Sequence, residues 1–290
     1  MMAGVMTHRR DFLTHAASAF AAASSQLKAS PARKNLPIGI QLYSVRGQLK
    51  KDLMETVRMV GKMGYQCVEF YAPYYSWDAA YAQSVRKLLY DSGLKCYSTH
   101  NSAAAFEPEG LKKAIELNHI IGSKAVVMAH PGKVTGGSDG WKRVADKLNQ
   151  ASVILQKDGL RAGYHNHNPE FRKLDDGGVP IDIVAGQTNK EVALQLDVAN
   201  CLDSGGNPVA YIEAHKGRIK SMHVKDWSPE KGKAYAVILG EGSAQWPAIF
   251  DAAESVGGVE YYLVEQEESA HPEMEAVKLS LEAYKRLHRG

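Results

Sequence analysis

The segment VALQLDVANCLDSGGNPVAYIEAHKGRIKSMHVKD, residues 192–226, contains two short aliphatic runs that both end in ionisable side chains. The first run ends at Asp197, and the second carries His223 and Lys225. A helix-like stretch separates the two runs, which is the pattern of a strand–helix–strand unit with parallel strands. This unit decides the fold, because most of the chain repeats it.

Eight such runs follow one another at intervals of about thirty residues, the length of one strand-and-helix unit. The predicted strands are Ile38–Tyr43, Gln66–Tyr71, Lys95–His100, Ala125–His130, Arg161–Asn166, Val192–Asp197, Ile219–Lys225 and Tyr261–Gln266. Between them, apolar residues at helical spacing predict helices such as 52–63 and 141–157. The pattern predicts an α/β protein, a single (β/α)8 TIM barrel. The alternative, an open doubly wound sheet, needs a glycine-rich phosphate loop after an early strand, and residues 44–47 do not form one.

The first thirty-three residues differ in character from the rest of the chain. Residues 6–13, MTHRRDFL, place two adjacent arginines before an alanine- and serine-rich stretch. This arrangement resembles a twin-arginine export signal, and the alternative is a frayed amphipathic helix. We therefore predict an export signal and linker in residues 1–33, a barrel in residues 34–290, and a protein that is periplasmic or exported through the twin-arginine route.

The composition is that of an ordinary globular protein, with 44% hydrophobic and 23% charged residues in a chain of 290. No apolar run reaches the roughly 18 residues of a transmembrane helix. The formal net charge is +3, and two of these charges belong to the first thirty residues. A nearly neutral barrel is a poor match for nucleic-acid phosphates, so the predicted partner is a small molecule, and the oligomeric state is left open. Cys67, Cys96 and Cys201 form no Cys-x-x-Cys pair, which predicts buried free thiols, with a Cys67–Cys96 bridge as the alternative.

Polar side chains gather at the ends of the predicted strands, where a parallel barrel keeps its catalytic groups. They are Glu69, His100, His130, His165, His167, Asp197, Asn200, His223, Lys225 and Glu265. Alternation along the strand places Ser221, His223 and Lys225 on one face, which we expect to point into the barrel mouth. Ionisable groups buried without partners would each cost several kcal/mol, and a bound cation would satisfy them.

Four of these side chains, on consecutive predicted strands, are candidate ligands of one metal ion: His165, Asp197, His223 and Glu265. Imidazole and carboxylate ligands suit zinc or manganese best, with magnesium as a further option, and they leave coordination positions for substrate oxygens. For each residue alone, the alternative is a hydrogen-bonded core side chain. We therefore predict a divalent-metal site at the barrel mouth.

Several strand-end motifs occur together in the second half of the chain. They are Asn166-His167, Leu196-Asp-x-x-Asn200, His223-Val-Lys-Asp226 and Val264-Glu-Gln-Glu267. In combination they resemble the xylose-isomerase-like barrel family over about residues 36–288. The segments Gly39–Arg46 and Gly240–Trp246 resemble its exported sugar phosphate isomerase/epimerase branch.

The resemblance implies a metal-dependent sugar isomerase or epimerase that removes a proton next to a carbonyl. Asp197, His223 and Glu265 match metal ligands of the family. His165 stands where the family usually has a glutamate, and Asn200 stands where it commonly has a histidine. The first departure removes one of the two matched glutamates on which the epimerases of the family depend.

Such chemistry assigns roles to the remaining polar residues. Glu265 and His165 are candidate bases. Lys225 is a third, because a neighbouring cation would lower its pKa, and a salt bridge to Asp226 or Glu267 is the alternative. The predicted substrate-binding residues are Glu69, His100, His130, His167, Asn200 and Trp246.

Two further functions stay open. Expulsion of a leaving group after the same proton removal would make the protein a lyase or dehydratase that acts on a keto-sugar or keto-glycoside. A non-catalytic, secreted sugar-binding barrel is the second alternative. The predicted export and the lack of a glycine-rich phosphate cradle favour a non-phosphorylated sugar. An endonuclease with three metal ions is disfavoured, because the chain lacks the histidines that it needs at Asn200 and after Asp226.

Overall fold

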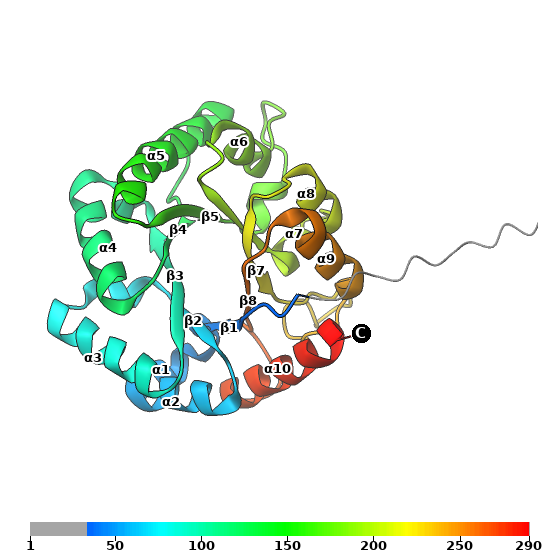
Figure 1. Cartoon of the computed structure of the whole chain (residues 1–290). Helices are drawn as coiled ribbons and strands as arrows, with labels where there is room; N and C mark the ends of the chain where they lie inside the picture. Colours follow the sequence, from blue (N-terminus) through cyan, green and yellow to red (C-terminus); the bar gives the residue numbers. More distant parts are fainter. Residues whose placement is uncertain (1–33, 290) are drawn as a thin grey trace, which may run out of the picture. The chain divides into compact units, whose positions relative to one another are not determined.

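Eight parallel strands close into a barrel in the computed structural model, which describes residues 34–289 (Figure 1). The strands follow one another around the barrel in sequence order, and β1 pairs with β8 to close it. They are β1 (Ile38–Gln41), β2 (Cys67–Phe70), β3 (Lys95–Ser102), β4 (Ala125–His130), β5 (Arg161–His165), β6 (Ala193–Asp197), β7 (Ile219–Val224) and β8 (Tyr261–Val264). The predicted TIM barrel is confirmed, and the open doubly wound sheet is wrong because the sheet closes on itself.

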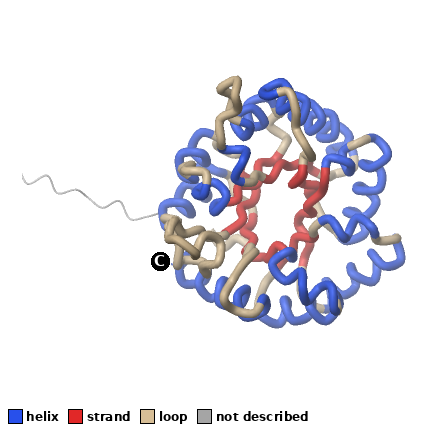
Figure 2. Tube along the Cα trace, turned by 180° about the vertical axis from the view of Figure 1, so that it is seen from behind, coloured by secondary structure: helices blue, strands red, loops and turns tan. Residues whose placement is uncertain are grey.

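Helices form an outer ring around the strands (Figure 2). The α-helices are α1 (Arg46–Lys51), α2 (Leu53–Met63), α3 (Ala79–Asp91), α4 (Pro108–Ile121), α5 (Gly137–Lys157), α6 (Pro180–Gln187), α7 (Val198–Asp203), α8 (Pro208–Ala214), α9 (Trp246–Ala252) and α10 (Glu273–Arg289). Shorter helical turns are η1 (Leu42–Val45), η2 (Ala72–Ser76), η3 (Ala103–Phe106), η4 (Asn168–Phe171) and η5 (Ala253–Gly257). Local sequence determines where α2 begins and ends: the Asp52 carboxylate accepts the N–H of Glu55 at 2.9 Å, and Gly64 ends the helix at φ 100°.

Several strand ends differ from the predicted ones for local reasons. β1 ends at Gln41 rather than Tyr43, because the side-chain oxygen of Gln41 accepts the N–H of Tyr43 at 3.1 Å and starts the turn η1. β3 runs on past His100, because Ser102 still pairs with β4. Polar residues that directly follow a strand, such as Glu265 after β8, therefore lie on the connecting loops at the barrel mouth.

The two faces of the strands have different environments. Outward-facing aliphatic residues such as Ile40, Val68 and Val126 are fully buried in the core. Each such side chain contributes about 1.5–3 kcal/mol. The inward face carries a small apolar cluster that contains Cys67 and Leu263 and becomes polar toward the carboxyl ends of the strands. The core therefore holds the strands in register, and the register brings the polar residues together.

Two other sequence-based expectations concern the chain as a whole. Cys67, Cys96 and Cys201 are buried free thiols, so the Cys67–Cys96 bridge is wrong. Within residues 34–289, no helix has the length and apolar character needed to cross a membrane. The predicted export signal in residues 1–33 lies outside the described residues.

Candidate metal centre

Four side chains meet at the carboxyl end of the barrel. His165 ends β5, Asp197 ends β6, His223 lies on β7, and Glu265 directly follows β8. One potential ligand atom of each lies within 4.8 Å of those of the other three, and all four residues are buried. Consecutive parallel strands thus bring the predicted metal ligands within reach of a single ion.

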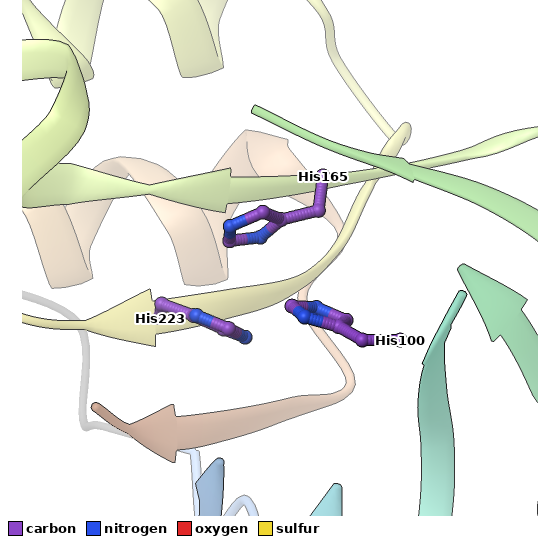
Figure 3. Close-up of side chains that lie close together, drawn as sticks. All are labelled: His100, His165 and His223. Carbon is purple, nitrogen blue, oxygen red and sulfur yellow. The ribbon is translucent and has the colours of Figure 1, made fainter. Parts of the chain in front are cut away.

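A third imidazole, that of His100 on β3, points toward those of His165 and His223 (Figure 3). The ring centroid of His165 lies 4.5 Å from that of His100 and 4.4 Å from that of His223. The Nδ1 atom of His165 is buried and has no hydrogen-bond partner among the described residues. An unpaired buried nitrogen is costly, and a metal ion would use its lone pair. The donor set fits a divalent metal ion, with His100 as an additional ligand candidate.

Glu69 on β2 is a buried carboxylate surrounded by hydrogen-bonding partners. Its partners are Gln41, Ser98, His100, Gln195 and His223. Its Oε1 atom lies 2.8 Å from Nε2 of His223 and 3.0 Å from Nε2 of His100. Burial acts to raise the pKa of Glu69, but the two imidazoles outweigh it and hold this pKa well below its usual range. Glu69 is therefore a charged group that orients two of the three central imidazoles.

The four ligand candidates have different protonation behaviour in the metal-free protein. Burial and the surrounding imidazoles lower the pKa of His165 well below its ordinary value, so its lone pair is available. Burial opposes the charge on His223, yet Glu265 and Glu69 raise its pKa to about 10. Burial raises the pKa of Asp197 to about 6, against the opposing effect of Lys225. Metal binding therefore has to displace a proton from His223.

A cavity of about 220 Å³ opens at the barrel mouth beside the ligand cluster. Its lining residues are Tyr43, Tyr71, Ala72, His100, His130, His165, His167, Glu265 and Glu267. We call this cavity the mouth pocket. Glu265 and Glu267 follow β8, whereas His130 and His167 belong to β4 and the loop after β5, on the opposite side of the closed barrel. The mouth pocket thus has a carboxylate wall that faces an imidazole wall.

Comparison with known proteins assigns the family. The family described as "Xylose isomerase-like TIM barrel" matches residues 57–287. The chain belongs to this family. An inosose dehydratase of Clostridium beijerinckii is 28% identical over 123 residues, which cover 37% of this chain and 40% of the length of that relative.

Solved structures share the xylose isomerase-like fold over most of the chain. A sugar phosphate isomerase/epimerase from Parabacteroides distasonis has a TM-score of 0.74 at 24% identity, and the match covers 89% of this chain and 96% of that one. The IOLI protein with a bound zinc atom has a TM-score of 0.66 at 17% identity, and the match covers 87% of this chain and 98% of that one. At these identities the two structures support the fold alone.

Two residues depart from the metal-site pattern that the xylose isomerase-like resemblance implied. His165 occupies the strand-five position of the usual glutamate, and its ring still reaches the ligand cluster. Asn200, at the position of the common histidine, uses its backbone N–H to donate to Asp197 Oδ1 at 2.8 Å. Its side-chain oxygen accepts from the hydroxyl of Tyr235 at 3.1 Å. Asn200 therefore orients Asp197 and is not among the residues that line the mouth pocket, and its role in substrate binding stays a prediction.

Glu69 and Trp246 also lie outside the mouth pocket. The carboxylate of Glu69 is saturated by its buried partners. Trp246 is 1% exposed, its indole N–H donates to Asp226 Oδ2 at 2.9 Å, and its ring packs on Phe250. Glu69 supports the ligand cluster and Trp246 belongs to the core, so neither side chain faces the mouth pocket, and their contacts with a sugar stay predictions. His100, His130 and His167 do line the pocket.

Lys225 is buried among carboxylates. Its ammonium group contacts Glu267 directly and lies 3.5 Å from Asp197 Oδ2 and 3.6 Å from Glu265 Oε2. Burial acts to lower the pKa of Lys225, but the three carboxylates hold it above its ordinary value. The lowered pKa predicted for Lys225 beside a bound cation stays a prediction, and in the metal-free protein the alternative salt bridge to Glu267 is present. In the metal-free protein Lys225 is therefore a positive charge held between carboxylates.

Sequence reasoning did not assign a role to Gln195 or Tyr71. Gln195 connects two parts of the site, because its Oε1 atom lies 2.6 Å from Nε2 of His100 and its Nε2 atom donates to Glu69 at 2.8 Å. Two-residue alternation with Asp197 was the available signal, since both side chains share the inward face of β6. Tyr71 lies just past β2 and carried no comparable signal.

Proposed function

We propose that this protein is a metal-dependent lyase that eliminates a leaving group from a keto-sugar or keto-glycoside. The observation that carries the proposal is the asymmetry of the mouth pocket, with Glu265 and Glu267 on one wall and His130 and His167 on the other. The epimerisation that the family resemblance implies uses a glutamate on each face of one carbon atom, whereas both carboxylates of the mouth pocket lie on one wall. Elimination requires one base and groups that hold the departing part, which is what these two walls offer. The similarity to an inosose dehydratase supports the same choice.

The ligand cluster would hold the metal ion through His165, Asp197, His223 and Glu265. A divalent ion, zinc or manganese by the donor set, supplies Lewis-acid polarisation of the substrate carbonyl and an adjacent hydroxyl. Glu69 keeps the imidazole of His223 in a fixed orientation, as outer hydrogen-bond partners of metal ligands do. Lys225 adds a fixed positive charge near the developing negative charge.

The carboxylate wall provides the base in this proposal. Burial opposes ionisation of Glu265, but Lys225 and His223 outweigh it and hold its pKa below the usual range. Glu265 is therefore ionised and accepts the proton from the carbon next to the carbonyl. The electron pair of that C–H bond forms a carbon–carbon double bond while the bond to the leaving oxygen breaks. The leaving oxygen takes a proton from solvent at the open mouth, and Glu265 returns its own proton to solvent.

We also propose that the sugar is non-phosphorylated and that the protein works after export. The residues that line the mouth pocket include two carboxylates and no lysine or arginine. Such a lining offers no guanidinium or ammonium group to pair with a phosphate, and its carboxylates accept hydrogen bonds from sugar hydroxyl groups. A fusion of residues 1–33 to a reporter that is active only outside the cytoplasm tests the export part.

The reaction itself is tested with keto-sugars and keto-glycosides in deuterated water. The protein loaded with zinc or manganese should release the leaving group and produce an unsaturated ketone. Deuterium in an otherwise intact sugar would instead indicate the second candidate, an isomerase or epimerase, which the resemblance of the strand-end motifs implies. If neither reaction occurs with zinc, manganese or magnesium, the proposal of proton removal next to a carbonyl is refuted.

A further inference from the structure

A second cavity adjoins the mouth pocket and shares His130 and His167 with it. This cavity measures about 510 Å³, and most of its lining side chains are apolar. The apolar residues are Pro131, Val134, Trp141, Pro169, Leu174 and Pro180. We call it the apolar trough. It lies between the loop after β4 and the loops after β5, directly beside the imidazole wall.

The apolar trough is unsuited to a sugar ring. The main carboxylate on its surface, that of Glu170, is already used: Oε1 accepts from the Tyr164 hydroxyl at 3.0 Å and Oε2 from the backbone N–H of His167 at 3.2 Å. Sugar hydroxyls placed against proline, valine and leucine side chains would lose hydrogen bonds to water without replacing them. An apolar group in the same place would instead be removed from water with a gain in free energy.

The two cavities also differ in size in a way that suggests a two-part ligand. The mouth pocket, at about 220 Å³, is smaller than the range of about 300–1,000 Å³ that is usual for ligand sites. The apolar trough brings the combined space well into that range. A ligand that fills both cavities has one polar part against the metal centre and one apolar part beyond His130 and His167.

The junction between the cavities favours a flat group. The rings of His130 and His167 are nearly parallel, with an interplanar angle of 16° and a centroid separation of 5.2 Å. Stacked aromatic rings present flat faces and edges on which a further planar ring packs well. A planar substituent on the sugar would therefore extend from the mouth pocket into the apolar trough along the rings of His130 and His167.

We infer that the substrate is a keto-glycoside whose sugar ring occupies the mouth pocket and whose aglycone is a flat apolar group, such as an aryl ring, bound in the apolar trough. This inference rests on the proposed function and specifies its leaving group. Elimination breaks the bond between the sugar carbon and the aglycone oxygen, the electron pair of that bond stays on the oxygen, and the oxygen takes a proton from solvent. The apolar trough holds the aglycone while this bond breaks.

Binding of two unreactive probes tests the inference. Phenyl β-D-glucopyranoside and methyl β-D-glucopyranoside have no carbonyl group, so they bind without being converted. Titration calorimetry on the full, zinc-loaded chain should show that the phenyl glycoside binds about tenfold more tightly than the methyl glycoside, which equals about 1.4 kcal/mol. Equal affinities, or no binding of either glycoside, would overturn the inference.

Variants then locate the preference in the apolar trough. Val134→Asp and Leu174→Asp each put a charge against the aglycone, so each should bring the two affinities within about threefold of one another and leave the methyl glycoside unaffected. The matched control is Val153→Asp on the outer face of α5, where Val153 is 55% exposed, and it should keep the phenyl preference. Circular dichroism and zinc content should show that both trough variants fold and bind zinc like the unmodified protein. If both variants then keep the preference for the phenyl glycoside, the phenyl group binds elsewhere and the inference is refuted.

A turnover measurement separates this inference from the proposed function. Elimination from phenyl and methyl keto-glycosides at equal kcat/KM would leave the lyase standing and remove the aglycone site. The opposite result is also informative. If the phenyl glycoside binds more tightly, the trough variants lose this preference and no metal supports elimination, the aglycone site is supported and the lyase is rejected.

Discussion

His223 has a carboxylate beside each of its ring nitrogens. Nδ1 lies 3.0 Å from Oε2 of Glu265, and Nε2 lies 2.8 Å from Oε1 of Glu69. Only one of these carboxylates, that of Glu265, belongs to the group of four candidate ligands. The two glutamates therefore have different functions at the residue scale: one is available to bind the ion, and the other orients the imidazole.

Loss of a ligand should abolish tight metal binding. We expect Asp197→Asn, His223→Ala and Glu265→Gln each to weaken zinc binding by more than the 10–100-fold typical of changes outside the ligand set. Zinc content after dialysis and competition with a fluorescent chelator measure this. Glu260→Gln, an exposed carboxylate paired with Arg161, is the control and should keep its zinc. Full zinc content in all three ligand variants would refute the proposed centre.

Replacement of Glu69 tests the orienting role. Glu69→Gln keeps the shape of the side chain but removes the charge that His223 and His100 contact. Because Glu69 is not in the group of four, we expect a smaller loss of zinc affinity, about 10–100-fold. An unchanged affinity in a folded Glu69→Gln variant would show that the carboxylate has no influence on the centre.

The three thiols should resist modification in the native protein. Cys67, Cys96 and Cys201 are buried, and burial raises the pKa of Cys96 to about 12 and that of Cys201 to about 12. Because the thiolate is the reactive form, a thiol reagent should label almost none of them before unfolding and all three afterwards. Only one reactive thiol in the unfolded, unreduced protein would reveal a disulfide and contradict the structure.

At the scale of elements, the inside of the barrel leaves little space at β1. A Cβ atom on Gly39 would lie 2.4 Å from Sγ and 2.6 Å from the carbonyl oxygen of Cys67 on the paired strand β2. Neither atom is the end of a long flexible side chain. Close pairing of β1 and β2 places Gln41 beside Glu69. This pairing depends on glycine at position 39, which has no side chain.

We expect Gly39→Ala to destabilise the protein by about 1–3 kcal/mol, the usual cost of overpacking a core. Urea unfolding followed by circular dichroism measures the change in the free energy of unfolding. The control is Gly186→Ala in α6, where a Cβ would meet nothing within 4 Å, and it should be neutral or stabilise by up to about 1 kcal/mol. Equal stabilities for the two variants would show that β1 can move away from β2.

At the scale of the whole molecule, the candidate ligands connect a large part of the barrel. They come from four consecutive strands, β5 to β8, and the last of these pairs with β1. An ion that binds all four side chains in the folded chain and not in the unfolded chain stabilises the entire closed sheet.

Removal of the metal should therefore lower the melting temperature. Zinc at about 100 times its dissociation constant stabilises the folded state by about 2.7 kcal/mol, which for a domain of this size is about 5–10 °C. Differential scanning calorimetry with added zinc and with a chelator measures the difference. The zinc effect should shrink on acidification through pH 6, because protons compete for Asp197, whose pKa is about 6 in the metal-free protein, and for His223. An unchanged melting temperature after verified zinc loading and removal would contradict a site that joins four strands.

The sequence by itself determined the barrel and the group of four candidate metal ligands at its mouth. Eight aliphatic runs at a regular interval predict a (β/α)8 barrel. Alternation along a strand assigns each side chain to the inner or outer face of that barrel. This is why His165, Asp197, His223 and Glu265 could be grouped as ligands before their distances were known.

Only the tertiary structure decided what each inner side chain contacts. Glu69 and His223 are 154 residues apart in sequence and 2.8 Å apart in the barrel, and no local pattern predicts that contact. The pKa of Lys225 depends on three carboxylates from two other strands, and the burial of Trp246 depends on Asp226 and Phe250. The physical reason is that hydrophobic periodicity is a property of neighbouring residues, whereas hydrogen bonds, pKa shifts and cavities arise where distant strands converge.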